Sequence, residues 1–395
     1  MSDLFYDAAQ IDYPIIDSDA HVNEPPELWQ DSVPAHLKDR APKVEKTDKG
    51  DIWVFDGGRE KWPVGLTATA GQSYFQYSPF GGSYEEMRPA SYDPEARLKE
   101  MDIDGIYAQV MYPSVTLKGA KIYSEDAELQ KACVRAYNDW IVDFCKVGKG
   151  RLVPQAIMLT TGLADSLEEL ERAMKAGHKG AVISSFPNGT LDPKDEDDKF
   201  WAVCEEADFP VVIHIGSFLR GGGGKALRNE KTWSSLAFVG KAAWTKAGGQ
   251  TLGVVCDLLF SGIFEKHPNL KIVLVESNIG WAPTLLEQAD DMFRRYRFYT
   301  GAHKVMSMMP SEIFHRNFYA TFLVDTVGMD LRHRLNIDHL MWSTDYPHSA
   351  SDWPDSRLSL EKNFRGIPKS EVYKMTHENC IKLYKMDDIP KKRFG

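Results

Sequence analysis

Short apolar runs recur along the chain, and amphipathic segments of helical length separate most of them. Eight runs have the continuous apolar character of strands buried on both faces; they occupy residues 14–21, 105–114, 152–160, 180–186, 210–216, 271–278, 318–324 and 339–348. The amphipathic segments occupy residues 127–146, 163–177, 197–208, 282–299 and 369–386. This alternation predicts an α/β fold with a parallel sheet closed into a (β/α)8 TIM barrel, and an open doubly wound sheet is the alternative.

Two segments, at about 30–93 and 217–258, interrupt the alternation. The first contains two β-prone pieces around Asp56-Gly57-Gly58, which predicts a hairpin, and the second begins with the glycine-rich stretch SFLRGGGGKALRN. Both follow predicted strands, so we expect both to lie over the C-terminal face of the barrel, as a substrate cover or an oligomer contact. Because no Pro-, Gly- or Ser-rich linker divides the chain, we expect residues 1–395 to form a single domain.

Composition narrows the class of protein. The 395 residues are 43% hydrophobic and 26% charged, which is typical of a globular protein with a large core. A net charge of −10 disfavours a nucleic-acid partner. The sequence has neither a signal-peptide pattern nor an apolar run long enough to span a membrane, so we expect a cytoplasmic protein without a membrane partner. Five dispersed cysteines without a C-x-x-C pair disfavour a disulfide framework or a thiolate zinc site.

Polar residues interrupt or end three of the predicted strands. Asp19 and His21 are two positions apart on the first strand and therefore share a face, whereas Asp17 lies two positions deeper and is expected to be structural. His214 ends an apolar strand, and Asp345 emerges after another. Alone, each could be a core histidine or a capping carboxylate. Together they form a nitrogen and oxygen ligand set that suits zinc, manganese or iron with an open coordination position.

At these positions the sequence resembles a known family, the amidohydrolase-2 branch of the metal-dependent amidohydrolase superfamily, which includes aminocarboxymuconate-semialdehyde and resorcylate decarboxylases. The resemblance rests on IDSDAHVNEP, VVIHIG, SGIFEKHPNLKIVLVESNIGWAP, STDYPH and ENCIKLY. It implies a (β/α)8 barrel with Asp19, His21, His214 and Asp345 as metal ligands, Asp19 replacing the first histidine of the H-x-H form. The chain departs from these decarboxylases after the sixth strand, where VESNIGW offers Glu276 instead of their acid/base histidine.

Three further residues raise the question of a second metal ion. Glu24, Glu276 and His348 could hold a second ion beside the first, with Asp345 as a bridge. In the mononuclear alternative, Glu24 caps the helix near Pro25, His348 hydrogen-bonds Asp345, and Glu276 is the general base. Arg220, next to the glycine run, could clamp a substrate carboxylate, although an exposed surface arginine is the simpler interpretation.

These features predict a divalent-metal-dependent enzyme acting on a small organic molecule. We favour hydrolysis of an amide or ester-type bond by a metal-activated water, with Glu276 or Asp345 taking the proton. The alternatives are non-oxidative decarboxylation, a dinuclear iron or manganese oxygenase, and a catalytically silent partner subunit. The oxygenase alternative comes from a small part of the family, similar to the 2-aminoisobutyrate hydroxylase, that works with a related barrel. We accordingly expect a homo-oligomer or a hetero-oligomer with a related barrel subunit.

Overall fold

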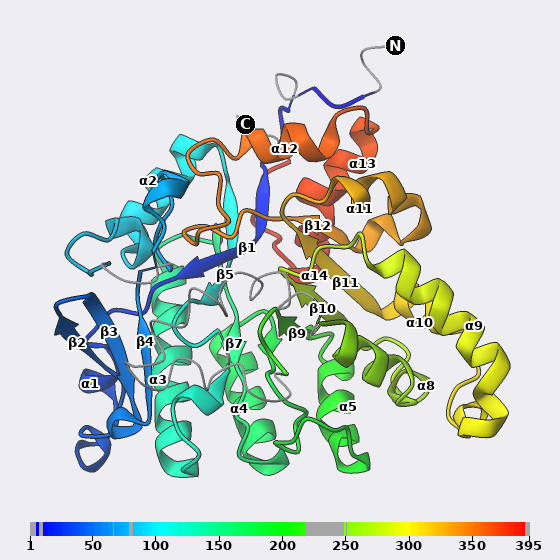
Figure 1. Ribbon diagram of the computed structural model, residues 1–395, viewed down its shortest axis with the longest axis horizontal. Coiled ribbons are helices and arrows are strands. Elements are labelled where there is room, and N and C mark those ends of the chain that lie inside the picture. The colour runs from blue at the N-terminus through cyan, green and yellow to red at the C-terminus, as the bar shows by residue number, and fades with distance from the viewer. Residues whose placement is uncertain are drawn as a thin grey trace.

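A ring of parallel strands forms the centre of the molecule (Figure 1). The computed structural model describes residues 5–7, 11–65, 67–78, 82–117, 119–218, 249 and 251–391. The strands of the ring are β1 (Ile16–Val22), β5 (Ala108–Pro113), β6 (Leu152–Pro154), β7 (Ala156–Ile157), β8 (Ala181–Val182), β9 (Val211–His214), β10 (Ile272–Val275), β11 (Phe318–Phe322) and β12 (Leu340–Trp342). Each of the eight apolar runs contributes to this ring, so the predicted strands are confirmed.

The ring closes through backbone contacts at two places. Parallel pairing gives the orders β1-β5-β6 and β12-β11-β10-β9-β8-β7. Gln155 alone separates β6 from β7, so these two strands are one run of chain with a local interruption. On the other side, the Asp345 amide donates to the Asp19 carbonyl at 2.9 Å and the His21 amide donates to the Tyr346 carbonyl at 2.6 Å. These bonds join the chain after β12 to β1, and the predicted TIM barrel is confirmed.

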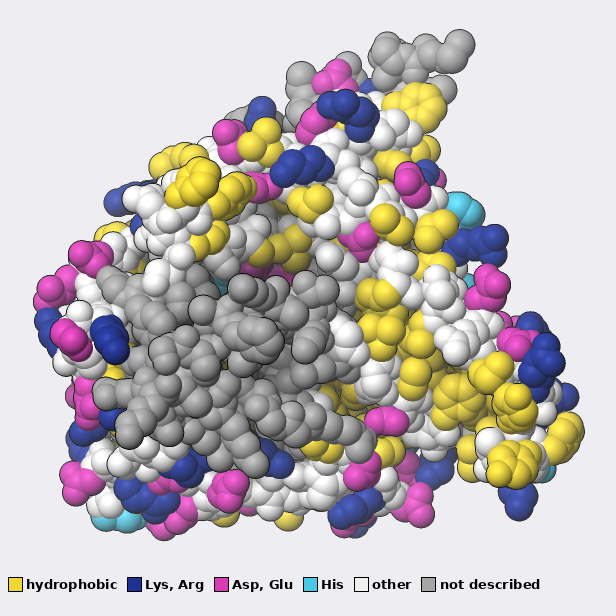
Figure 2. All heavy atoms as spheres, in the orientation of Figure 1, with side chains coloured by type: hydrophobic (Ala, Val, Ile, Leu, Met, Phe, Trp, Pro, Cys, Tyr) yellow, Lys and Arg dark blue, Asp and Glu magenta, His cyan; other side chains and the backbone are white. Residues whose placement is uncertain are grey.

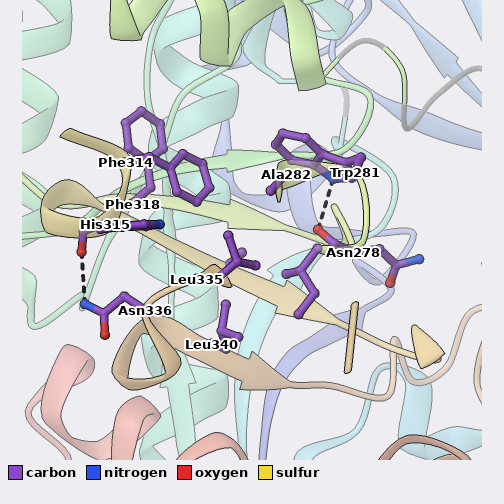
Figure 3. A pocket seen from close by; sticks show the side chains of 11 residues that line it. Asn278, Trp281, Ala282, Phe314, His315, Phe318, Leu335, Asn336 and Leu340 are labelled. Carbon is purple, nitrogen blue, oxygen red and sulfur yellow. Dashed lines mark hydrogen bonds between the residues drawn. The ribbon is translucent and has the colours of Figure 1, made fainter. Parts of the chain in front are cut away.

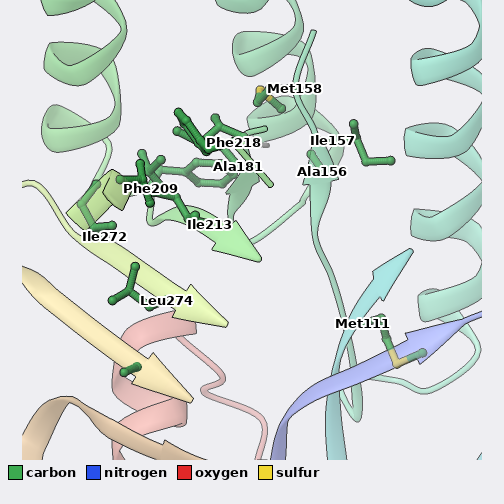
Figure 4. Close-up of a cluster of buried hydrophobic side chains, with 14 of the residues drawn as sticks. Met111, Ala156, Ile157, Met158, Ala181, Phe209, Ile213, Phe218, Ile272 and Leu274 are labelled. Atoms are coloured by element: carbon green, nitrogen blue, oxygen red, sulfur yellow. The ribbon is translucent and has the colours of Figure 1, made fainter. Parts of the chain in front are cut away.

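The strands bury both of their faces, which explains their continuous apolar sequence. One hydrophobic cluster gathers side chains from inside the ring, among them Val110, Val212 and Val273. A larger cluster lies between the ring and the surrounding helices. Figure 4 shows part of this outer layer, in which Ile213 of β9 and Leu274 of β10 belong to the same cluster.

Helices surround the ring on its outer side (Figure 1). These outer helices are α1 (Leu28–Ser32), α2 (Pro94–Asp104), α3 (Ala127–Lys146), α4 (Leu163–Ala176), α5 (Asp198–Glu206), α8 (Ile263–Lys266), α9 (Ala282–Thr300), α10 (Pro310–Asn317), α11 (Thr326–Leu331), α12 (Arg357–Phe364) and α13 (Lys369–Tyr373), and α14 (Asn379–Tyr384) lies at one end of the ring. The predicted helix at 127–146 matches α3, whose start is capped by the Asp126 carboxylate. The helix expected at 369–386 is divided into α13, a π-helical turn at Lys374–Glu378, and α14. Among the described residues, no helix is long and apolar enough to cross a membrane.

Helix α14 closes the N-terminal end of the barrel. The side chain of Asn379 donates to the carbonyl of Leu340, the first residue of β12, and Lys385 donates to the carbonyl of Asp208, just before β9. Leu383 and Tyr384 pack into the inner cluster. The barrel interior is therefore sealed by apolar side chains at this end, which leaves the opposite end for chemistry.

The first insertion forms an antiparallel sheet of β2 (Lys43–Thr47), β3 (Gly50–Phe55) and β4 (Glu60–Pro63). The predicted hairpin is β3–β4, and β2 adds one more strand to it. The following loop reaches the C-terminal end of the barrel, because the Asn23 side chain donates to the Thr67 carbonyl and the Thr69 amide donates to the Pro347 carbonyl. The second insertion falls largely on residues 219–248 and 250, outside the described residues.

Candidate metal centre

Six side chains of metal-ligand type meet at the C-terminal ends of three strands, β1, β9 and β10, and in the turn after β12. They form two overlapping groups, Asp19, His21, His214 and Glu276 in one, and His21, Asp345 and His348 in the other. Within each group, the candidate ligand atoms lie within 4.8 Å of one another. The structure thus brings together all four residues predicted to hold a first metal ion, together with two of the three predicted for a second.

Short contacts connect the two groups through His21. Its Nε2 lies 3.3 Å from Asp19 Oδ1 and 3.2 Å from Asp345 Oδ1. His214 Nε2 lies 3.3 Å from the same oxygen of Asp19, and His214 Nδ1 lies 3.9 Å from Glu276 Oε2. The imidazole of His348 stacks on that of His21 with ring centroids 3.9 Å apart.

Three atoms of this cluster are buried without a hydrogen-bond partner. They are Asp19 Oδ2, His21 Nε2 and Asp345 Oδ1. Buried polar atoms in proteins nearly always have a partner, and one without a partner costs about 1–3 kcal/mol. Three such atoms of metal-ligand type, aimed at one region, fit a divalent cation, because the cation would satisfy all of them at once. The cluster can therefore hold a divalent metal ion.

The surroundings of the three carboxylates shift their pKa values in opposite directions. Burial alone would raise the pKa of Asp345, but the charge of His348 and the contact with His21 outweigh it and lower that pKa. Burial would likewise raise the pKa of Asp19, yet the charge of His214 and the contacts with both histidines lower it. Partial burial raises the pKa of Glu276 well above its usual value, and the negative charges of Asp345 and Asp19 raise it further. The surroundings thus favour the anionic form of Asp19 and Asp345 and the protonated form of Glu276.

The backbone at two of these carboxylates is strained. Glu276 has φ 53° and Asp345 has φ 58°, which is the left-handed region that residues other than glycine rarely adopt. Strain of this kind persists where the surrounding structure enforces it, and it is concentrated at functional sites. Here it turns each carboxylate off its strand end toward the cluster.

Neighbouring residues fix the orientation of two histidines. His21 Nδ1 lies 2.9 Å from the carbonyl of Pro113, to which it can only donate, so Nε2 is the nitrogen that faces the cluster. His348 has Nδ1 at 3.0 Å from Asp345 Oδ1 and Nε2 at 2.9 Å from Ser114 Oγ. Sequence reasoning missed Ser114, although its position at the end of the second predicted strand was a usable signal.

Glu24 has a different role from either of the two predicted for it. Its Oε2 accepts a hydrogen bond from the Val115 amide and its Oε1 accepts one from the Thr116 hydroxyl, each at 3.0 Å. It belongs to neither of the two groups found among the described residues, and α1 has no side-chain cap. The carboxylate therefore holds the turn after β5, because a fully buried Glu24 is drawn to the free donors of that turn. Burial raises the pKa of Glu24 to about 7.

Asp17 lies on the other face of β1 from that predicted. The pairing of β1 with β5 shifts register between Asp17 and Ala20, which is the signature of a β-bulge. Asp17 consequently faces Gln109, whose Nε2 donates to it at 3.0 Å, and it accepts a further bond from the Thr344 amide at 2.9 Å. Its predicted structural role agrees with these bonds, although strict alternation along the strand fails.

One predicted site residue is not described, and one cavity lies apart from the cluster. Arg220, the predicted substrate clamp, lies outside the described residues. A cavity of about 10 Å³, large enough for one water molecule, lies between β11, α10 and the start of α9 (Figure 3). Its walls include Phe314, Phe318 and Leu335, and none of the six cluster residues lines it.

Comparison with known proteins agrees with this architecture. The chain is 23% identical over 307 residues to a gamma-resorcylate decarboxylase from a Rhizobium species, which covers 74% of this chain and 87% of that protein. It is 24% identical over 304 residues to a 2-amino-3-carboxymuconate-6-semialdehyde decarboxylase from Dictyostelium discoideum, covering 74% of this chain and 77% of the relative.

Solved structures and a family model cover nearly the whole chain. An amidohydrolase from Mycobacterium avium subsp. paratuberculosis superposes with a TM-score of 0.74 at 18% identity, covering 94% of this chain and 99% of that one. A manganese-bound dihydroxybenzoic acid decarboxylase from a Polaromonas species gives 0.64 at 18% identity, covering 97% and 100%. The family model described as amidohydrolase matches residues 16–386. The chain therefore belongs to the amidohydrolase family of metal-dependent enzymes.

Proposed function

We propose that this enzyme removes carbon dioxide from a small organic acid in a metal-dependent, non-oxidative decarboxylation. The observation that carries this proposal is the cluster of three buried ligand atoms without hydrogen-bond partners, in a barrel whose curated relatives include decarboxylases. The substrate would be an acid whose carboxylate lies beside a second oxygen, so that both can approach one cation. Hydrolysis, which the sequence favoured, becomes the second candidate.

Asp19, His21, His214 and Asp345 are the proposed metal ligands. They combine two anionic carboxylates with two imidazoles, a set suited to zinc, manganese or iron. When bound, the ion would supply Lewis acidity that stabilises negative charge on the substrate oxygens. The hydrogen bond from His21 to the Pro113 carbonyl keeps that ring turned toward the ion.

Glu276 is the proposed proton donor. Its side chain is 21% exposed, whereas those of His348 and Asp345 are 12% and 3% exposed, so it is the most accessible of the six. In decarboxylation the bond between the substrate carbon and the carboxylate breaks, carbon dioxide leaves, and the electron pair remains on carbon. Glu276 transfers its proton to that carbon and recovers one from solvent. Glu276 thereby takes the role of the acid/base histidine in the decarboxylases that the sequence resembles.

The accessible carboxylate also favours the second candidate, hydrolysis. If Glu276 is ionised when substrate is present, it can take a proton from an attacking water and then give it to the leaving group. The same residue then acts first as a base and afterwards as an acid. The difference from decarboxylation is the bond that breaks, so the products distinguish the two reactions.

A second metal ion is favoured by the overlap of the two groups. The two groups share His21 and together contain six ligand-type side chains, while a single zinc ion commonly takes about four ligands. Glu276 belongs to the group of Asp19, His21 and His214, whereas Asp345 and His348, together with His21, could hold a second ion. A pair of iron or manganese ions would favour the oxygenase alternative. Glu24 would then hold the turn after β5 and would not be a ligand.

The test combines metal analysis with product analysis. Protein purified without added metal is analysed for bound metals, then supplied with manganese and incubated with 2,6-dihydroxybenzoate, a panel of related acids, and amide and ester substrates. We expect release of carbon dioxide that Glu276→Gln lowers by about a hundredfold, with Glu128→Gln, an exposed site, as the control. Amide or ester cleavage without carbon dioxide release would favour hydrolysis, and two irons with oxygen consumption would favour the oxygenase. Absence of metal binding would overturn the proposal and revive the silent-subunit alternative.

A further inference from the structure

Polar groups are distributed very differently at the surface and inside the barrel. Figure 2 shows acidic and basic side chains interspersed along the edge of the molecule. The inner cluster of the barrel is mainly aliphatic, and among its described buried members only Tyr112 and Tyr384 carry hydroxyl groups. Burying a hydroxyl group is costly unless it is hydrogen-bonded. Aliphatic side chains would fill this space without that cost, so the two hydroxyl groups indicate a role beyond packing.

The two hydroxyl groups are hydrogen-bonded to each other. Tyr112 Oη and Tyr384 Oη lie 3.1 Å apart, although 272 residues separate them in the sequence. Tyr112 belongs to β5 and Tyr384 is the last residue of α14. Both side chains are buried. The bond therefore joins a strand of the ring to the helix that closes the N-terminal end of the barrel.

The ring of Tyr112 lies against two of the proposed metal ligands. Its centroid is 5.4 Å from that of His214, with an interplanar angle of 64°, and 6.1 Å from that of His21, with an angle of 47°. The pairing of β1 with β5 places His21 directly beside Tyr112. Tilted and edge-to-face contacts at these distances are the favourable arrangements of aromatic rings. A shift of the Tyr112 ring would consequently displace both imidazoles.

The backbone holds the two histidines to different degrees. His21 Nδ1 lies 2.9 Å from the carbonyl of Pro113, on the neighbouring strand. His214 Nδ1 lies 3.2 Å from the carbonyl of Ile215, the next residue in its own chain segment. His214 thus has the longer backbone contact and also the shorter ring contact with Tyr112. Its orientation should depend on Tyr112 more strongly than that of His21.

We propose that Tyr112 is a positioning residue of the metal centre, and that its hydrogen bond to Tyr384 sets the angle at which His214 and His21 present Nε2 to the metal ion. The inference rests on the ligands assigned under the proposed function, and it adds the closing helix α14 to the parts of the chain that shape the site. Partners that orient metal ligands typically contribute 10–100-fold to metal affinity or activity. Tyr112 acts through the two histidines.

Removing the two hydroxyl groups, singly and together, tests the link. Tyr112→Phe and Tyr384→Phe each break the hydrogen bond and keep the ring. We expect each variant to bind Mn²⁺ about tenfold more weakly than the wild-type chain. The double variant should lose no more than either single variant, because the same bond is missing in all three. Calorimetric titration of the metal-free proteins with Mn²⁺ measures the affinities, and additive losses would overturn the proposal.

The environment of the bound ion separates positioning from a general loss of stability. The electron paramagnetic resonance spectrum of bound Mn²⁺ should change in both phenylalanine variants. Tyr13→Phe is the matched control, because the Tyr13 hydroxyl lies 3.2 Å from Thr376 Oγ1 and its ring lies 5.5 Å from that of His377, which is not a proposed ligand. This control loses a comparable bond beside a histidine and should keep the wild-type affinity and spectrum. Urea unfolding of the metal-free proteins measures stability separately.

The outcomes distinguish this inference from the ligand assignment. Wild-type affinity and spectrum in both Tyr112→Phe and Tyr384→Phe would overturn the role of the tyrosine pair and leave the ligands as assigned. Equal changes in Tyr13→Phe would overturn it as well, because the effect would then be general. A wild-type chain that binds no Mn²⁺ would overturn both the inference and the ligand assignment. None of these measurements depends on which reaction the enzyme catalyses.

Discussion

Two neighbouring sets of buried polar side chains at β1 differ in how completely they are hydrogen-bonded. The Asp17 network consists of Asp17, Arg97, Gln109 and Thr344 on the outer face, and Arg97 donates to the carbonyl of Ala90 and to Gln109 Oε1. The ligand cluster, made of Asp19, His21, His214, Glu276, Asp345 and His348, contains three buried atoms without partners. A complete network stabilises the fold, whereas an incomplete one is kept for an external group. Burial alone does not distinguish the two.

The largest expected effect comes from a change in the ligand cluster. Asp345→Ala should abolish metal binding and lower activity by more than about a hundredfold, since even residues that only support metal ligands contribute 10–100-fold. The unfolding midpoint of the metal-free protein should change little, because the loss of a buried oxygen without a hydrogen-bond partner is offset by the greater strain of alanine in the left-handed backbone at this position. Metal titration, turnover and thermal unfolding measure the three quantities. Retained activity in this variant would mean that the reaction occurs elsewhere.

An alanine substitution in the Asp17 network should lower stability rather than metal binding, which is the opposite of the result expected for Asp345→Ala. Asp17→Ala leaves the Thr344 amide and Gln109 Nε2 without their acceptor, and should lower the free energy of unfolding by about 3 to 4 kcal/mol. Asp17→Asn, which keeps an acceptor oxygen, is the matched control and should lose less. Urea unfolding of the metal-free proteins gives the comparison. If Asp17→Ala were as stable as wild type, the distinction between the two sets would fail.

Glu24 sharpens the comparison because the sequence left it open between a ligand of a second metal ion and a helix cap. Its pKa in the folded protein, raised by burial from 4.5 to about 7, means that the folded state holds a proton that the unfolded state releases. Stability should therefore fall as pH rises from about 4.5 to about 7, by a total of about 3 kcal/mol. Glu24→Gln should remove the part of the slope that Glu24 contributes and leave metal content unchanged. The part due to Asp17, whose pKa burial also raises to about 7, should remain. Urea unfolding of the metal-free protein across this range measures the slope. A loss of bound metal in Glu24→Gln would return Glu24 to the ligand cluster.

The strands and the main site residues were predictable for a shared physical reason. Strands buried on both faces need continuous apolar runs, and a polar residue that interrupts such a run is conspicuous. His214 and Asp345 were found in this way. The β-bulge that turns Asp17 outward has no such signal, since it depends on how β1 pairs with β5. The contacts of Glu24 could not be predicted, because its partners, Val115 and Thr116, lie more than 90 residues away in another turn.

The smallest expected effect concerns Ser114, which connects the two kinds of environment. Glu24 accepts hydrogen bonds from the Val115 amide and the Thr116 hydroxyl, and Ser114 precedes these residues in the same turn. The hydroxyl of Ser114 lies 2.9 Å from His348 Nε2. Ser114→Ala removes one of the two contacts that orient the His348 ring, and should weaken metal affinity by about tenfold. Ser114→Thr keeps the hydroxyl and should restore most of that affinity, while the free energy of unfolding should change little in either variant. Wild-type metal affinity in Ser114→Ala would show that Asp345 and the stacked His21 ring are sufficient to orient His348.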